Sequence, residues 1–180
     1  MAEYIDVLDV NGIPTGTKKT RAEIHRDGDW HQAVIVAILN NKNRVLLQRR
    51  APDKDKYPNM WDISLAAHVS AGNDSVSTII RENNEEIGIQ IPITIKVSEF
   101  RFLKCFRDSR AIGDFKENQF YDLFAMRLNW PLSKYSFNDG EVSEIKFADY
   151  TELIAMERQG LLHPRTQWID FVHKYITNSL

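Results

Sequence analysis

The alternation of apolar and polar positions divides this chain into short strands joined by polar turns. The longest apolar run, residues 33–39, has the length of a strand that is buried on both faces. Residues 4–10 alternate and end at Asn11-Gly12, a dipeptide typical of tight turns. The same reasoning predicts further strands or extended segments at 44–48, 61–69, 91–106, 119–128 and 142–147, with polar loops at 108–116 and 131–140.

Four helices are expected along the chain. Val76, Ile79, Ile80 and Ile87 predict a helix that begins at Asn73 or Asp74 and stops at Gly88. Short helices are expected at 20–25 and 150–159, and Pro164 suits the first turn of a last helix. That helix carries an apolar stripe that we expect to face the core: Trp168, Phe171, Val172 and Ile176.

Size and composition restrict the classes of protein. The chain has 180 residues, 43% hydrophobic and 27% charged, which fits a single globular domain over 1–180. A formal charge of −2 gives no reason to expect binding to nucleic acid or to an anionic membrane. The apolar runs are too short to cross a bilayer, and the first residues do not form a secretory signal. The lone Cys105, which we interpret as a packing residue, suits a cytoplasmic location.

Three carboxylates crowd the end of the helix expected at 74–87. Glu82, Glu85 and Glu86 are spaced so that they share one helix face. In a cleft, each like-charge pair would repel by roughly 3 kcal/mol at a separation of ~6 Å and an effective dielectric of ~20. A recessed cluster would therefore need a divalent cation, and oxygen ligands favour Mg²⁺ or Mn²⁺. The alternative is a solvated acidic face on a surface helix.

The segment 67–89 resembles the Nudix box. That motif reads Gly, five residues, Glu, seven residues, then Arg-Glu-apolar-any-Glu-Glu-any-Gly-apolar. Six of its nine specified positions match here: Arg81, Glu82, Glu85, Glu86, Gly88 and Ile89. Three depart, since Ala67 replaces Gly, Asn73 replaces Glu, and Asn83 replaces an apolar residue. Asn83 falls four residues after Ile79, so we expect its amide to face the core.

The resemblance implies an α/β Nudix fold, a mixed β-sheet sandwiched between helices. It also implies roles for the residues of the box. Glu82, Glu85 and Glu86 would hold the metal with the backbone carbonyl of Ala67, and Arg81 would orient one of these glutamates. Glu85 or Glu82 would act as the base, with Glu117 or Glu144 as substitutes for the missing charge at position 73.

The resemblance extends to the branch that includes type 1 isopentenyl-diphosphate isomerase. It is carried by Arg21-Ala-Glu-Ile-His25, Trp30-His31, Leu46-Leu-Gln-Arg-Arg50-Ala, Lys54, Tyr57-Pro-Asn-Met-Trp61 and Ala67-His68. It implies a possible second metal site at His25, His31, His68 and Glu117, with Gln119 in place of a second glutamate. It implies diphosphate binding by Arg21, Arg50 and Lys54, whose cationic groups suit phosphate.

The chemistry of the isomerase itself is not expected. Ala66 stands where the isomerase has its catalytic cysteine, and a methyl group cannot transfer a proton. Arg165 appears at the place of a tryptophan that lies near the carbocation, which a guanidinium would repel.

The sequence therefore predicts Mg²⁺- or Mn²⁺-dependent hydrolysis of a diphosphate bond in a nucleoside diphosphate derivative or related organic diphosphate. Tyr57 and Trp61 are aromatic rings that could stack on a base, although packing is the simpler role for Trp61. Two alternatives stay open: a diphosphate-binding protein with degraded catalysis, and an isomerase that uses a different acid. The partner is a small molecule, and the loops leave room for a homodimer.

Overall fold

The computed structural model describes residues 2–85, 99–135 and 140–178, with only the backbone of residues 83–85. Across these residues, nine strands form one mixed sheet: β1 (Tyr4–Leu8), β2 (Pro14–Thr20), β3 (Trp30–Leu39), β4 (Val45–Arg50), β5 (Trp61–Ile63), β6 (Leu65–His68), β7 (Arg101–Ile112), β8 (Phe115–Arg127) and β9 (Val142–Ala148). The helices of the described part are α1 (Arg21–Asp27), α2 (Ser75–Glu85), α3 (Tyr150–Arg158) and α4 (Trp168–Ile176), with a 3-10 turn at Leu132–Lys134.

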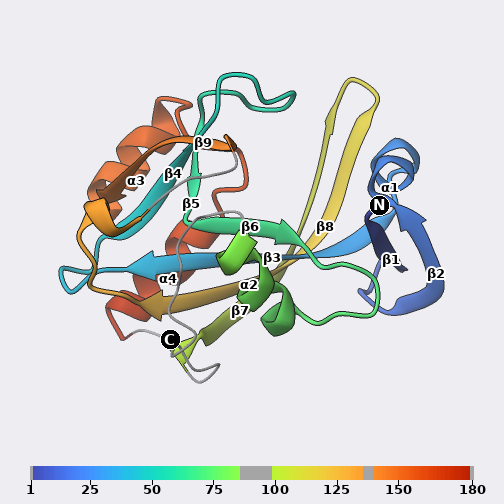
Figure 1. Cartoon of the computed structure of the whole chain (residues 1–180), viewed down its shortest axis with the longest axis horizontal. Coiled ribbons are helices and arrows are strands. Elements are labelled where there is room, and N and C mark those ends of the chain that lie inside the picture. The colour runs from blue at the N-terminus through green and yellow to red at the C-terminus, as the bar shows by residue number, and fades with distance from the viewer. Residues whose placement is uncertain (1, 86–98, 136–139, 179–180) are drawn as a thin grey trace.

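Strand β3 is the centre of the sheet (Figure 1). It pairs antiparallel with β6 and parallel with β8, and it meets β4 where Leu39 pairs with Val45. Side chains of β3 alternate between two cores. The odd-numbered residues from Ala33 to Leu39 pack with residues of α3 and α4. The even-numbered residues from Val34 to Ile38 pack with Ile79 of α2. Helices therefore cover both faces, which confirms the expected mixed sheet between helices and explains the continuous apolar run.

Helix α1 is fixed at both ends by its sequence. The hydroxyl of Thr20 accepts a hydrogen bond from the backbone N–H of Glu23 at 3.4 Å, and the Glu23 carboxylate accepts from the N–H of Thr20 at 2.9 Å. Gly28 ends the helix with φ 78°, a left-handed conformation that glycine adopts without strain. These two caps set the direction in which Arg21 and His25 project.

Asp74, not Asn73, is the N-cap of helix α2, because its carboxylate accepts a hydrogen bond from the N–H of Ser77 at 2.8 Å. Ile79 is fully buried, as predicted. The assignment of Ile80 to the apolar face was wrong, since this side chain is 43% exposed. The side chain of Asn83, together with Ile87 and Gly88, lies outside the described residues.

The single strand predicted over 61–69 is two strands. Ser64 breaks it: its buried hydroxyl donates to the carbonyl of Leu46 at 2.6 Å and accepts from the N–H of Ile38 at 2.9 Å. This side chain satisfies backbone groups on β4 and β3, so the chain passes from β5, paired with β4, to β6, paired with β3. The change of partner brings Ala67 and His68 to the edge of β3.

The prediction of a loop at 108–116 is also wrong. Strands β7 and β8 form a long hairpin that turns at Gly113 (φ 56°) and extends away from the sheet (Figure 1). Most side chains of β7 contact solvent, so the apolar alternation that would reveal a strand is absent there. Cys105 lies on this strand and is exposed, which corrects its interpretation as a packing residue.

The last helix begins at Trp168, not at Pro164. Residues 163 and 165 are instead held in the core, where the N–H of His163 donates to the carbonyl of Trp61 at 2.7 Å. The apolar stripe is confirmed as core contact, because Trp168 and Val172 are each 1% exposed and Phe171 packs beside them. In the described part of the chain, no helix is long and apolar enough to cross a membrane.

Candidate active site

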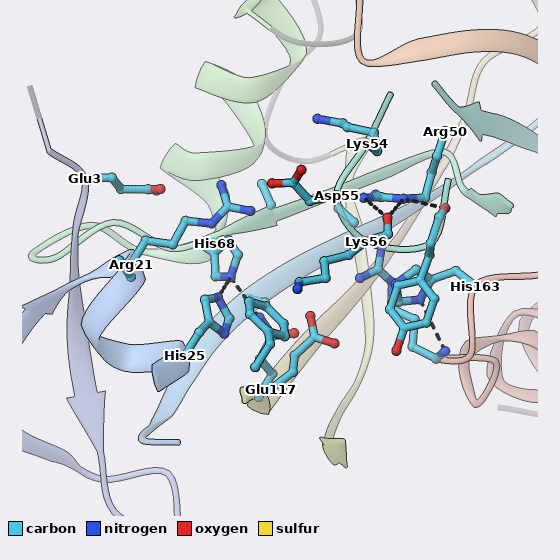
Figure 2. Close-up of a pocket in the computed structure, with 18 of the residues that line it drawn as sticks. Glu3, Arg21, His25, Arg50, Lys54, Asp55, Lys56, His68, Glu117 and His163 are labelled. Atoms are coloured by element: carbon cyan, nitrogen blue, oxygen red, sulfur yellow. Dashed lines mark hydrogen bonds between the residues drawn. The ribbon is translucent and has the colours of Figure 1, made fainter. Parts of the chain in front are cut away.

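A cavity of about 870 Å³ lies between α1, α2, β6, the first half of β8 and the loop after β4 (Figure 2). It is lined by residues from distant parts of the chain, which the fold brings together. Eight of the residues predicted from sequence line it: Arg21, His25, Arg50, Lys54, Ala67, His68, Glu82 and Glu117. His31 is fully buried and, like Arg81 of α2, is not part of this lining.

Two specified positions of the Nudix box, Ala67 and Glu82, line this cavity. Glu82 is only 4% exposed, and its carboxylate is ion-paired with the guanidinium of Arg81. Ala67, on β6, lines the same cavity. The buried carboxylate of Glu82 is an oxygen donor of the kind that Mg²⁺ and Mn²⁺ prefer, so the described part of the box fits such an ion. The side chain of Glu85 and all of Glu86 lie outside the described residues.

Three imidazoles meet at one wall of the cavity. The candidate ligand nitrogens of His25, His31 and His68 all lie within 4.8 Å of one another. Nδ1 of His25 lies 3.0 Å from the carbonyl oxygen of Lys116, and Nδ1 of His31 lies 3.0 Å from that of Asp29. Both Nδ1 atoms therefore carry the proton and donate, which leaves both Nε2 atoms as acceptors. The Nε2 atoms of His25 and His68 are 3.2 Å apart.

Glu117 lies outside this three-histidine group, although it lines the cavity. Its carboxylate pairs with Arg110 at 3.0 Å. The group closest to the imidazoles is the amide of Gln119, with Nε2 2.9 Å from His31 and 3.0 Å from His68. The Tyr121 hydroxyl donates to the Gln119 carbonyl oxygen, so the amide N–H groups face the rings. The structure thus brings together three of the four predicted ligands.

Burial keeps these histidines neutral. It lowers the pKa of His31 to about 4 and holds the pKa of His68 well below its ordinary value. It also lowers the pKa of His25, against the opposing effect of the Lys116 carbonyl. At neutral pH the imidazoles therefore offer lone pairs and hydrogen bonds, not positive charge.

The three cations predicted to bind the diphosphate reach the cavity from different elements (Figure 2). Arg50 donates from Nε and Nη2 to the carbonyl oxygen of Lys56, at 3.2 and 2.9 Å, and from Nε to that of Tyr57 at 3.2 Å. Lys54 is ion-paired with Glu141. Arg21, at the start of α1, makes no ion pair or hydrogen bond through its side chain within the described residues.

One buried ion pair in the cavity wall was not predicted. Arg165 is 6% exposed, Asp62 is 2% exposed, and the Arg165 guanidinium donates to the Asp62 carboxylate. Burial acts to lower the pKa of Arg165, but Asp62, Tyr121 and Glu117 together outweigh it and the pKa is raised. The two residues are 103 positions apart, so no local pattern could have paired them. Lys56 was also missed; it lines the cavity two residues after Lys54.

Comparison with known proteins agrees with this geometry. The NUDIX domain family profile matches residues 29–169, and the chain therefore belongs to the Nudix hydrolase family. Members of this family generally hydrolyse diphosphate bonds with the help of a divalent metal.

Three relatives place the chain within the family. It is 30% identical over 162 residues to an uncharacterized Nudix hydrolase of Listeria monocytogenes, covering 90% of this chain and 89% of that one. It is 40% identical over 154 residues to Nudix hydrolase 3 of Arabidopsis thaliana, covering 83% of this chain but only 20% of that much longer protein. It is 30% identical over 153 residues to isopentenyl-diphosphate Δ-isomerase of Shigella flexneri, covering 84% and 80%.

Solved structures share the fold at lower identity. The DR0079 protein of Deinococcus radiodurans superposes with a TM-score of 0.71 at 18% identity, covering 96% of this chain and 98% of that one. The NUDIX domain of Shewanella oneidensis NrtR, solved with ADP ribose, superposes with a TM-score of 0.58 at 12% identity, covering 81% and 87%. These likenesses confirm the predicted fold class.

Proposed function

We propose that this chain hydrolyses a diphosphate bond in a nucleoside diphosphate derivative or related organic diphosphate, with Mg²⁺ or Mn²⁺ as cofactor. The observation that carries the proposal is that Glu82 and Ala67 of the Nudix box line the same cavity as Arg21 and Arg50. Carboxylate for a metal and guanidinium for phosphate are the two requirements of this chemistry.

The metal would be held by Glu82, Glu85 and Glu86, with the carbonyl of Ala67. When bound, it would polarise the phosphoryl oxygens and lower the pKa of the attacking water. The ion pair with Arg81 orients the carboxylate of Glu82. Since Glu82 is committed to this pair, Glu85 is the proposed base that accepts the proton of the water.

The guanidinium groups of Arg21 and Arg50 bind phosphoryl oxygens and position the substrate. The water oxygen forms a bond to phosphorus, and the bond from that phosphorus to the bridging oxygen breaks. The products are two phosphate-containing molecules, or a monophosphate and inorganic phosphate. Ala66 lines the same cavity and cannot donate a proton, which supports hydrolysis over isomerisation.

Domain organisation, oligomeric state, location and substrate class complete the proposal. The two larger core clusters both use β3, and the largest draws on residues from 33 to 176, which supports one domain over the whole chain. A homodimer and a cytoplasmic location stay predictions from sequence. Nucleoside diphosphate derivatives are the first substrates to test, because the NUDIX domain of NrtR was solved with ADP ribose.

The test is release of phosphate or of a phosphorylated product from nucleoside di- and triphosphates, sugar nucleotides and isoprenyl diphosphates, with and without Mg²⁺ or Mn²⁺. Metal-dependent release from one class is the expected result. Glu82→Gln should abolish it, because the buried carboxylate loses its charge, whereas the exposed Glu157→Gln should retain it. No release across the panel, or full activity of Glu82→Gln, would overturn the proposal.

A further inference from the structure

The cations of the cavity differ in whether a carboxylate neutralises them. Three are paired: Arg26 with Asp27, Lys54 with Glu141, and Arg165 with Asp62. Within residues 2–85, 99–135 and 140–178, the other three cations of the lining, Arg21, Arg50 and Lys56, have no carboxylate partner. Of these three, Lys56 is the one that the family resemblance did not indicate.

The backbone at Lys56 is held in place by a residue of the proposed phosphate site. Arg50 donates twice to the Lys56 carbonyl oxygen, at 2.9 and 3.2 Å, and once to that of Tyr57 at 3.2 Å. Tyr57 has φ 50°, a left-handed conformation that residues other than glycine rarely adopt. Its ring packs 4.4 Å from that of His163, centroid to centroid. Such strained turns persist where the surroundings impose them, and they concentrate at functional sites.

The side chain of Lys56 extends from this turn into the cavity, toward the wall that holds His25 and Glu117 (Figure 2). Its ammonium lies 4.8 Å from the centroid of the Phe115 ring, near the tip of the β7–β8 hairpin. Glu117 does not neutralise it, since that carboxylate is paired with Arg110 at 3.0 Å. The ammonium is therefore stabilised on one side by an aromatic face and left available to an anion in the cavity.

We propose that Lys56 binds the substrate by donating a hydrogen bond to a non-bridging oxygen of the diphosphate, beside Arg21 and Arg50. This inference rests on the proposed function for the identity of the substrate. Of the two lysines in the cavity, it assigns to Lys56 a larger contribution to diphosphate binding than to Lys54. Lys54, which the sequence resemblance points to, must first give up its ion pair with Glu141. Lys56 gives up no carboxylate of the described chain.

The test measures binding of inorganic pyrophosphate to the full chain by titration calorimetry, with chelator and then with Mg²⁺. Because a hydrogen bond to a charged group is at stake, Lys56→Met should weaken binding by about tenfold or more. Lys54→Met should weaken it by a smaller factor, and Lys42→Met, on the exposed turn before β4, should leave it unchanged. Methionine keeps the apolar contact with Phe115, and Lys56→Arg should restore most of the affinity.

The outcomes separate this inference from the proposed function. If the wild type binds pyrophosphate through Lys56 but releases no phosphate from any substrate, the inference holds and the hydrolase fails. If the wild type hydrolyses a diphosphate while Lys56→Met keeps the same affinity and KM, the inference fails and the hydrolase holds. Absence of pyrophosphate binding by the wild type, or equal losses in Lys54→Met and Lys56→Met, would also overturn it. Should Lys56→Met unfold early in a thermal melt, Lys56→Gln provides the same comparison.

Discussion

The ion pair between Arg165 and Asp62 is the most buried ion pair in the described part of the chain, so its loss should destabilise the fold. The Arg165 side chain is 8% exposed and that of Asp62 is 1% exposed. The other carboxylate oxygen of Asp62 accepts from the N–H of Ile63 at 2.8 Å, so this carboxylate is held in position on β5. Arg165→Met removes the positive partner and leaves the charge of Asp62 buried without the cation that pairs with it.

The expected loss is about 3–5 kcal/mol in the free energy of unfolding, the range for breaking a buried pair on one side. That is a large share of the roughly 5–15 kcal/mol that stabilises a typical domain. Most of the cost comes from the stranded carboxylate, not from the lost attraction. The double variant Asp62→Leu, Arg165→Met removes both charges, so we expect it to recover much of the loss.

Denaturant unfolding at neutral pH, followed by circular dichroism, measures these differences. Arg44→Met is the matched control, because Arg44 pairs with Glu152 at 2.6 Å with side chains that are 37% and 49% exposed. An exposed pair contributes about 0–1 kcal/mol. If Arg165→Met lost no more stability than Arg44→Met, or if the double variant were less stable than Arg165→Met, the reasoning from burial would be refuted.

Three further predictions concern other parts of the molecule. Thr20→Ala removes the cap of α1 and should lower the free energy of unfolding by about 1 kcal/mol. The control Thr17→Ala, at an exposed position, should change the free energy of unfolding little. Equal losses in the two variants would contradict the capping role. Because the pKa of His31 falls from 6.5 to about 4 on folding, the stability it contributes is fully present above pH 6.5 and lost toward pH 4. The loss amounts to at most about 3 kcal/mol in metal-free protein. Unfolding curves recorded with chelator across that range check this, and His31→Asn should flatten the dependence. Glu86→Gln should abolish hydrolysis with an unchanged circular dichroism spectrum, and activity equal to that of the exposed-site variant Glu157→Gln would disprove its role.

Local patterns predicted much of the architecture. The apolar run at 33–39 lies within β3, and the cap at Asp74 begins α2 as one of the two positions expected. The prediction failed where a strand lies in solvent, as in β7, or where one buried side chain redirects the backbone, as at Ser64. Hydrophobic periodicity reports contact with a core, so it cannot reveal a hairpin that extends beyond one.

In the candidate site too, local motifs predicted some features and the tertiary structure set the others. The Nudix box is contiguous, so its motif identifies the family, and ordered motifs point to Arg21, Arg50 and the three histidines. Which side chains contact one another depends on the register between strands. The parallel pairing of β3 with β8 places Gln119 beside His31, whereas Glu117 forms an ion pair with Arg110.

By itself, the sequence determined the class of protein, the helix that carries Glu82, and three of the cations that line the cavity, Arg21, Arg50 and Lys54. The tertiary structure decided which charges are neutralised. Lys54 is paired with Glu141 while Lys56 projects into the cavity, although the two lysines are two residues apart. Arg165 is paired with Asp62 across 103 positions. Ion pairing depends on distances of a few ångströms between distant segments, and only the folded chain sets those distances.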